Sequence, residues 1–291
     1  LEAELRNLGM EETRSLVESM SEIWEEGGWS VSATAPGRFV VVCRNVEDEL
    51  PEGHPPQEAD LRDYGYFLPR HRDGQQLRDL LERSHACLSE HSVNEVRLDL
   101  GENPANGFWI WGGGRPHRPP PKTSEGDRRI GVLSHSRLAL GLAELLEIDR
   151  VEMKNPWTME REERDTFAGE VLAPAIARFD FLLVYIEAPF DYGRYGSGAD
   201  KVRSIELLDQ MIVESLNVYT HSVDASRVII TTDTTISSRT STWEPGDLPF
   251  ILAGEDVSAD GVTHWDESDC REGSLGHVYV NELERILRST F

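Results

Sequence analysis

The second half of the chain alternates short apolar runs with segments of helical periodicity, and this alternation limits the fold more than any other feature. The apolar runs cover residues 130–133, 181–186 and 228–232, and the helical segments cover residues 136–146 and 200–217. Continuous apolar strands separated by helices are typical of a parallel sheet that is covered on both faces. We therefore expect the α/β class, with a mostly parallel sheet and helices on both faces, over residues 130–291.

The first 115 residues predict a smaller α+β unit. Apolar positions at helical spacing indicate helices over residues 11–23 and 75–90, a β-branched run indicates a buried strand over 39–43, and alternation indicates an exposed strand over 96–100. Residues 47–69, rich in proline, glycine and acids, predict a loop. The prolines within residues 116–129 break all periodicity, so this stretch is predicted to link two domains, residues 1–115 and 130–291.

The stretch 103–115 has a composition that suits neither an ordinary helix nor an ordinary strand. Trp109 and Trp111 alternate with apolar residues and predict a short strand with an aromatic face, and three glycines follow before Arg115. Glycines permit backbone conformations and close approaches that side chains would forbid. A flexible turn that ends in arginine can hold a phosphate or a carboxylate. A hinge between domains explains the same composition, and both interpretations stay open.

Composition excludes some classes of function. The formal net charge of −24 argues against general nucleic-acid binding, because most of this surface would repel a phosphate backbone. No apolar run is long enough to span a bilayer and no signal-peptide pattern is present, which favours a soluble, cytoplasmic protein. The three cysteines lack CxxC spacing and indicate reduced, mostly buried thiols rather than a disulfide framework or a zinc ribbon.

Acidic side chains follow the predicted strands of the second half. Glu187 and Asp191 come after the strand 181–186, and Asp233 comes directly after the strand 228–232. Ligands of open α/β sheets collect at the carboxyl ends of the strands. The sequence therefore places a candidate functional site at this edge of the sheet.

The chain resembles the archaeal-type, cofactor-independent phosphoglycerate mutases. The strongest likeness lies in 103–115, which that family ends in Trp-Gly-Gln-Gly-Arg, and in the segment 181–189 with its Glu-Ala-Pro sequence. Weaker likenesses follow in the family's order at residues 36–42, 77–93, 233, 247–250 and 272–276. The resemblance implies part of an alkaline-phosphatase-like core over residues 130–291 and an insert-type domain over residues 1–115. It also implies an enzyme family that interconverts 3-phosphoglycerate and 2-phosphoglycerate.

The resemblance implies metal ligands at positions where this chain carries other residues. In the family, two divalent ions, usually manganese or zinc, activate a serine that is transiently phosphorylated. Phe190 and Arg194 stand where the family has a ligand aspartate and a ligand histidine. Thr234 and Trp243 stand where it has two further histidines. These four side chains do not form a dinuclear site for such cations.

Few remnants of the family's catalytic groups are left. Asp191 lies one residue from the expected aspartate, and Asp233 is retained, so both are candidate metal ligands, although Asp233 can also cap a turn or a helix. The family's remaining aspartate and its nucleophilic serine belong to a segment that would precede this sequence, and no such signature is found near Leu1. We therefore assign no catalytic residue.

Three interpretations follow. We favour a degenerate member of the family that acts by binding or regulation, with an anion pocket formed by Arg38, Arg115 and Arg194, no cofactor, and a protein partner or a like subunit. Alternatively, the chain is a phosphoryl-transfer enzyme that uses manganese or zinc, with Asp191, Asp233 and Glu244 as rearranged ligands and its N-terminal segment carried elsewhere. The third interpretation is a protein that uses the fold only as a platform for surface interactions.

The remaining polar residues indicate a functional site less clearly. Residues 264–270 can be interpreted as a metal loop, but a solvated loop is favoured. Ser134 and His135 suggest a nucleophile and a base, yet adjacent side chains on an extended segment point apart. His277 has no evident partner. Arg203, together with Arg194, either neutralises a bound anion or pairs with nearby carboxylates.

Overall fold

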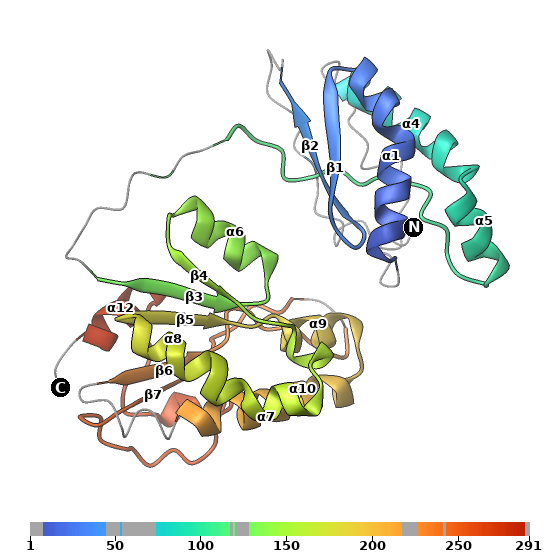
Figure 1. Ribbon diagram of the computed structural model, residues 1–291. Coiled ribbons are helices and arrows are strands. Elements are labelled where there is room, and N and C mark those ends of the chain that lie inside the picture. Colours follow the sequence, from blue (N-terminus) through green and yellow to red (C-terminus); the bar gives the residue numbers. More distant parts are fainter. Residues whose placement is uncertain are drawn as a thin grey trace. The chain divides into compact units, whose positions relative to one another are not determined.

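The computed structural model describes residues 8–44, 53, 74–116, 119, 128–216, 226–240 and 243–288. The chain divides into two compact units, Leu1–His117 and Arg118–Phe291 (Figure 1). The predicted loop 47–69, apart from Gly53, and most of the predicted linker lie outside the described residues. No helix in the described ranges combines the length and the apolar character needed to cross a membrane.

The first unit packs helices against a two-stranded antiparallel hairpin. Its elements are α1 (Met10–Glu26), β1 (Trp29–Ala35), β2 (Arg38–Cys43), α4 (Gln75–Ser89) and α5 (Ser92–Asp99). The core gathers apolar side chains spaced by three or four residues on α1 and α4, together with aromatic residues from β1 and from the segment after α5, among them Trp24, Trp29 and Phe108. The predicted helices 11–23 and 75–90 are thereby confirmed.

The structure corrects three predictions in this unit. Residues 39–43 form a strand, but Val40 and Val42 are exposed, because a two-stranded hairpin packs only one face on the helices. Residues 96–100 belong mostly to α5 and form no strand, since His91 caps a helix that buries Asn94 and Arg97. The aromatic strand predicted around Trp109 is also wrong, because residues 102–116 have no regular secondary structure.

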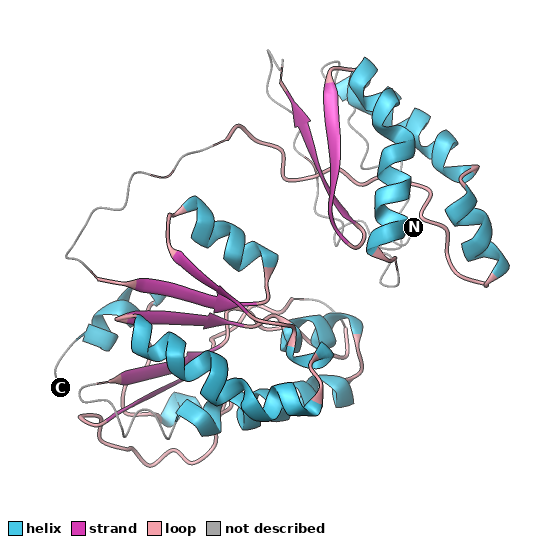
Figure 2. Ribbon diagram, in the orientation of Figure 1, coloured by secondary structure: helices cyan, strands magenta, loops and turns pink. Residues whose placement is uncertain are grey.

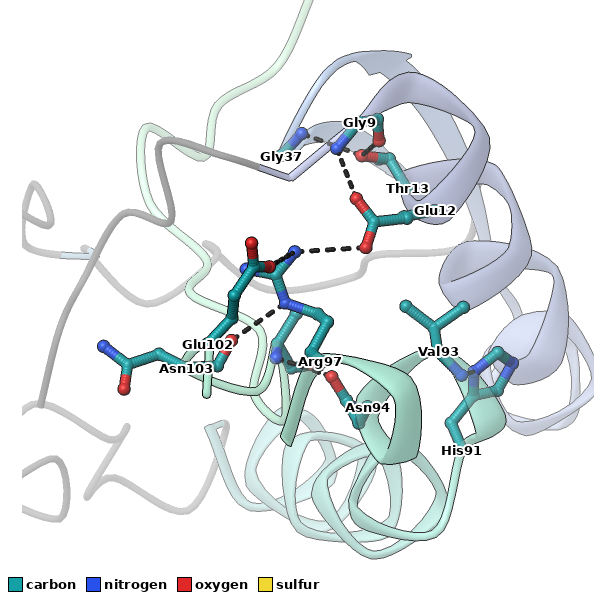
Figure 3. A network of polar contacts seen from close by, with 11 residues as sticks. Gly9, Glu12, Thr13, Gly37, His91, Val93, Asn94, Arg97, Glu102 and Asn103 are labelled. Atoms are coloured by element: carbon teal, nitrogen blue, oxygen red, sulfur yellow. Dashed lines mark hydrogen bonds and ion pairs between the residues drawn. The ribbon is translucent and has the colours of Figure 1, made fainter. Parts of the chain in front are cut away.

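A buried arginine joins α5 to the start of α1 (Figure 3). The Arg97 side chain is 2% exposed and pairs with Glu12 at 3.1 Å and Glu102 at 3.2 Å. Its Nε also donates to the carbonyl oxygen of Asn103 at 2.9 Å. Glu12 in turn accepts from the backbone N–H of Gly9, and this bond and Arg97 hold the pKa of Glu12 below its usual value against a smaller opposing effect of burial. The network therefore fixes the segment after α5 to the N-terminal turn of α1.

The second unit is built on a three-stranded parallel sheet in the order β4-β3-β5 (Figure 2). The strands are β3 (Ile130–Ser134), β4 (Asp149–Glu152) and β5 (Phe181–Tyr185). The helix α6 (Arg137–Leu145) packs on β3 and β4. A second helical layer contains η2 (Pro156–Thr158), α7 (Arg161–Phe167), η3 (Ala168–Leu172) and α8 (Ala173–Arg178). Leu133 of β3 is fully buried against this second layer.

The chain continues through α9 (Ala188–Tyr195), α10 (Gly198–Leu208) and η4 (Asp209–Val213) to β6 (Arg227–Thr231) and β7 (Phe250–Gly254). β6 and β7 pair antiparallel and, within the described residues, have no backbone hydrogen bonds to the parallel sheet. The unit ends with η5 (Asp269–Glu272) and α12 (Val280–Arg288). The predicted α/β class, a parallel sheet flanked by helices, is confirmed, and β4 and β7 are strands that the sequence did not indicate.

Candidate functional site at the carboxyl ends of β3, β5 and β6

Two serines shape the turn that leads from β3 into α6. Ser134 and Ser136 are almost completely buried. The Ser134 hydroxyl donates to the carbonyl oxygen of Tyr185 at 2.6 Å, so it joins the ends of β3 and β5. Ser136 caps α6 by accepting from the N–H of Ala139 at 3.3 Å, and its hydroxyl donates to Oε1 of Glu187 at 2.6 Å. Ser136, which follows β3, is therefore hydrogen-bonded to the carboxylate of Glu187, which follows β5, a neighbour of β3 in the sheet.

His135 lies between these serines in a partly buried position. Its Nε2 atom is buried and has no hydrogen-bond partner among the described residues. Burial lowers the pKa of His135, and the negative charge of Glu187 opposes that shift. The side chain is therefore neutral over a wider pH range than an exposed histidine. The Ser134 hydroxyl donates to the carbonyl oxygen of Tyr185 instead of to His135 Nε2.

Three carboxylates of the second unit, Glu187, Asp191 and Asp233, help to raise the pKa of the Tyr185 phenol. The Tyr185 hydroxyl donates to Oδ2 of Asp233 at 2.9 Å, which bridges the ends of β5 and β6. Burial raises the pKa of Tyr185 most, followed by the hydrogen bond and charge of Asp233 and then by the charges of Glu187 and Asp191. We call these three carboxylates and Tyr185 the strand-end cluster. Asp233 accepts this bond from Tyr185, and its predicted role as a turn or helix cap stays a prediction.

The loop after β6 folds back over α9 and α10. An isolated β-bridge joins Ile236 to Trp243, and Ile236 is buried. A Cβ atom on Gly193 of α9 would lie 2.5 Å from the Ile236 side chain, so only glycine permits this contact. Lys201 of α10 donates to the carbonyl oxygen of Ile236 at 2.8 Å. The loop is therefore held against both helices close to the strand-end cluster.

An aromatic pair stands beside this loop. The rings of Phe190 and Trp243 meet edge to face with their centroids 6.2 Å apart. The two residues come from the start of α9 and from the far end of the loop, so the fold brings together positions more than fifty residues apart in sequence. Trp243 is 65% exposed, and the pair therefore forms a surface contact rather than part of the core.

The three candidate anion-binding arginines belong to different units. Arg194 lies on α9, 9% exposed, and interacts with neighbouring groups. Arg38 and Arg115 are exposed residues of the first unit. The pocket predicted from all three therefore stays a prediction. In the glycine run before Arg115, Gly112 has a positive φ of 67° and an added Cβ would meet nothing within 4 Å, so the backbone conformation there, rather than close contact, favours glycine.

The other predicted clusters have ordinary partners. His264 lies 3.2 Å from Asp269, and Asp266 accepts backbone bonds in an exposed loop, which fits the solvated interpretation of residues 264–270. His277 has a partner after all, since its Nδ1 lies 3.9 Å from Asp247. Arg203 pairs with Asp200, one turn away on α10, rather than with a strand-end carboxylate.

The donor set does not fit a metal centre of the kind that the resemblance implies. Within the part of the chain that the structure describes, no three histidine, cysteine, aspartate or glutamate side chains lie close enough together to hold a metal ion. Two of the three carboxylates in the strand-end cluster accept hydrogen bonds from protein hydroxyls. The cysteines are free and partly buried.

Sequence reasoning found the strand-end carboxylates but missed the groups that bind them. Tyr185 was assigned to a buried strand as an ordinary apolar position, and Ser136 only to the start of a helix. A serine immediately before a helical segment is a recognisable capping signal. No spacing rule links it to Glu187, because the two residues approach only once β3 and β5 are paired.

Comparison with known proteins gives related chains over nearly the whole length. The 2,3-bisphosphoglycerate-independent phosphoglycerate mutase of Methanothrix thermoacetophila is 30% identical over 283 residues, which are 95% of this chain and 70% of the relative. Phosphoglycerate mutase 2 of the same type from Methanothermobacter thermautotrophicus is 28% identical over 284 residues, which are 95% of this chain and 68% of the relative. No protein-family model matches the chain.

Solved structures agree on the fold. A protein of Pyrococcus horikoshii superposes with a TM-score of 0.69 and 18% identity, over 98% of this chain and 71% of that protein. A cofactor-independent phosphoglycerate mutase from Thermoplasma acidophilum superposes with a TM-score of 0.51 and 20% identity, over 99% of this chain and 70% of that enzyme. The chain therefore spans about 70% of the length of either protein.

Proposed function

The chain belongs to the 2,3-bisphosphoglycerate-independent phosphoglycerate mutase family, and from this premise we propose that it is a non-catalytic, phosphoglycerate-mutase-like binding or regulatory protein. Its ligand is a small phosphorylated or carboxylate compound, bound by Arg194 of α9 without transfer of a phosphoryl group. The proposal includes a cytoplasmic location and a protein partner or like subunit.

The observation that carries the proposal is the contact between Phe190 and Trp243. The resemblance implies an aspartate ligand at the first position and a histidine ligand at the second. Here the rings of the two residues pack against each other, with their centroids 6.2 Å apart. Benzene and indole rings offer no lone pairs to a divalent cation, whereas carboxylates and imidazoles do. A metal centre that depends on these two positions is thus replaced by an apolar contact.

The state of the remaining carboxylates supports the same proposal. Glu187 accepts a hydrogen bond from Ser136, and Asp233 accepts one from Tyr185. Each of these carboxylates therefore has a protein donor that stabilises it without a metal. Without the divalent ions, the family's nucleophile would lose its activation and the phosphoryl group its electrophilic partner. Mutase activity of this chain is therefore proposed to be absent or very small.

An arginine can take over part of the charge neutralisation. Arg194 stands at the position that the resemblance gives to a ligand histidine, and its backbone lies on α9 next to the strand-end cluster. A guanidinium group carries a permanent charge and several fixed donors, so it can bind a phosphate or a carboxylate without a metal. This supports binding of an anion at α9 as the retained function.

Calorimetric titration of 3-phosphoglycerate into the purified full chain, with a chelator present, tests the proposal. We expect saturable binding that weakens about tenfold or more in Arg194→Gln, because a charged hydrogen bond contributes about 1.5–3 kcal/mol. Arg203→Gln is the matched control, since Arg203 is exposed and pairs within its own helix. If the first variant does not fold, Arg194→Lys keeps the charge and removes the planar fork.

Two results would contradict the proposal. The first is the absence of saturable binding, which would favour a protein that uses the fold only as a platform. The second is mutase turnover by the metal-loaded chain at a rate comparable to that of the relatives. Equal affinities of the wild-type protein, Arg194→Gln and Arg203→Gln would show that the ligand binds elsewhere, and the same titration with Arg38→Gln and Arg115→Gln would then test those positions.

One observation favours a second candidate function, a metal-dependent phosphoryl-transfer enzyme. Glu187 follows β5, Asp191 lies in the first turn of α9 and Asp233 follows β6, so three carboxylates share one edge of the sheet. About 30% of the length of the Methanothrix thermoacetophila relative also lies outside the matched region. If that additional segment brings further ligands, manganese or zinc could be held there with Glu244 as a further donor. Mutase activity that appears only when manganese and a polypeptide carrying that segment are both added would favour this function.

A further inference from the structure

The outer face of α6 carries a row of exposed leucines. The helix packs on β3 and β4 and buries Ala143 (Figure 1). Leu138, Leu142 and Leu145 are 64%, 49% and 48% exposed. A helix turns by about 100° per residue, so these three leucines lie on one side, which is turned away from Ala143. We call them the α6 stripe, and a surface helix normally turns such a stripe toward other protein.

A glycine lies in the middle of the α6 stripe. Gly141 is exposed, and a Cβ atom added to it would meet no atom of the described residues within 4 Å. It belongs to the regular part of α6, where glycine is destabilising relative to alanine. Close approach of a second helix would explain its presence, because the missing side chain leaves room for a leucine from the facing helix.

The two ends of α6 differ in charge. The exposed Arg137 begins the helix. The other end borders a hollow of about 320 Å³, which is lined by Glu144, Glu147, Ile148, Asp149, Arg150 and Glu152. Arg150 pairs with Glu144, and Arg178 pairs with Asp149, each at 2.7 Å. We call this the acidic hollow, since its carboxylates outnumber these arginines, and a further guanidinium group would offset the excess negative charge.

The stripe, the glycine and the charged ends are complementary to themselves. Two copies of α6 can cross antiparallel about the midpoint between residues 141 and 142. Leu138 of one copy then faces Leu145 of the other, and Leu142 faces Gly141. Arg137 of each copy lies beside the acidic hollow of the other. Such reciprocal contacts, in which residue i meets j and j meets i, are the property of a two-fold interface.

From these observations we propose that the α6 stripe and the acidic hollow form the centre of a two-fold interface with a second copy of this chain. The formal net charge of −24 repels a second copy at long range, so association depends on this local match of leucines and opposite charges. The second copy is therefore the like subunit to which the protein binds.

Sedimentation equilibrium of the purified full chain in the micromolar range tests the interface. We expect a dimer, and Leu142→Glu should raise its Kd at least tenfold, because the variant places a carboxylate at the centre of the contact. Leu98→Glu is the matched control, since Leu98 is 59% exposed on α5 of the first unit, and it should leave the Kd unchanged. Both leucines are exposed, so both variants should keep the melting temperature of the wild-type protein.

An exchange of charges tests the antiparallel arrangement. Arg137→Glu and Glu147→Arg each bring like charges together in a dimer of identical chains, so each variant alone should dimerise at least tenfold more weakly than the wild-type protein. An equimolar mixture of the two should form heterodimers, because both contacts then join opposite charges again. Arg161→Glu controls for the change in net charge, since Arg161 is exposed on α7 and pairs within its own helix.

Three results would overturn the inference: a wild-type protein that stays monomeric over this range, a Kd that Leu142→Glu leaves unchanged, or a mixture of the two charge variants that forms no heterodimer. The first would mean that no second copy covers the α6 stripe. The other two would mean that the subunits meet through another surface or in another orientation.

The inference does not depend on the proposed anion ligand. Titration of 3-phosphoglycerate into Leu142→Glu should give the wild-type affinity, because the proposed ligand is bound by Arg194 of α9. A monomeric wild-type protein that binds 3-phosphoglycerate would overturn the interface alone. A dimer that binds no anion would contradict the proposed function and leave the interface supported.

Discussion

Arg97 in the first unit and the carboxylates of Asp191 and Asp233 in the second unit are charged groups in opposite surroundings. In the first unit, Arg97 is 2% exposed and has two carboxylate partners and a carbonyl partner. In the second unit, Asp191 and Asp233 are exposed, and Asp233 accepts a hydrogen bond from the phenol of Tyr185. The buried arginine is satisfied from several directions, whereas the carboxylates at the strand ends remain open to solvent on at least one side.

This difference in burial distinguishes charged groups that stabilise the fold from charged groups that are candidates for function. A buried charge persists only when partners surround it, because its desolvation is costly. An exposed carboxylate at the end of a strand has no such requirement, so its position reflects the site rather than the stability of the core. Variants in the two regions should therefore differ both in the size of their effect on stability and in their effect on ligand binding.

The largest effect is expected in the first unit. Arg97→Met should lower the free energy of unfolding by about 3 kcal/mol, because it removes two ion pairs to partly exposed carboxylates and leaves the carbonyl oxygen of Asn103 without its donor. Urea denaturation measures this loss. Arg83→Met is the matched control, since the pair between Arg83 and Glu26 is exposed on both sides and should contribute less than about 0.5 kcal/mol. Equal losses in the two variants would mean that burial does not distinguish the regions.

A smaller loss of stability is expected for changes at Ser136, the buried serine that is hydrogen-bonded to Glu187 of the strand-end cluster. Ser136→Ala should lower the free energy of unfolding by about 2 kcal/mol, because it removes both the cap of α6 and a hydrogen bond to Glu187. Ser197→Ala removes an exposed cap of α10 and should lower it by about 1 kcal/mol. Thermal unfolding of both variants gives the difference. If the two variants lose the same stability, the bond to Glu187 contributes nothing.

The bridge between β5 and β6 should contribute less than the buried cap. Tyr185→Phe removes only a hydroxyl, and the free energy of unfolding should fall by about 1 kcal/mol or less, because Asp233 remains solvated. Burial also raises the pKa of Tyr192, so spectrophotometric titration of the wild-type protein should show at least two tyrosines that ionise above the usual range, and the variant should show one fewer. An unchanged number in Tyr185→Phe would assign the raised pKa to another residue.

The smallest expected effect is that of His135 on the pH dependence of stability. Burial lowers the pKa of His135 in the folded protein below the value near 6.5 of an unfolded chain, so the unfolded chain binds more protons at intermediate pH. The contribution to stability is therefore complete above about pH 7 and is lost as pH falls from about 6.5 toward the folded pKa. Urea midpoints at several pH values should fall less steeply in His135→Gln than in the wild-type protein. Parallel curves would contradict this assignment.

The alternation of apolar runs and helical segments was enough to predict the fold class and most elements of the second unit. It failed where a strand carries few apolar residues. β4 has the sequence Asp-Arg-Val-Glu and lies at the edge of the sheet, so neither composition nor burial marks it. In the first unit, Val96, Leu98 and Leu100 alternate like a strand, yet the helix is fixed by the buried Asn94 and Arg97, whose partners lie elsewhere in the chain.

The candidate site was predictable only in part. The rule that ligands gather at strand ends indicated Glu187, Asp191 and Asp233. In the structure, the negative charges of all three raise the pKa of Tyr185. The contact between Phe190 and Trp243 could not be derived from spacing, because it depends on how the loop after β6 folds onto α9. Side chains that meet through tertiary structure leave no periodic signal in the sequence.

We propose above all that the ends of β5 and β6 hold no metal centre. Calorimetric titration of manganese and zinc into the purified, metal-free chain tests it most directly, with elemental analysis of the protein as isolated. The account predicts no stoichiometric binding with submicromolar affinity. One or two ions bound per chain with submicromolar affinity, and lost in Asp233→Asn, would contradict it and assign the metal to the strand-end cluster.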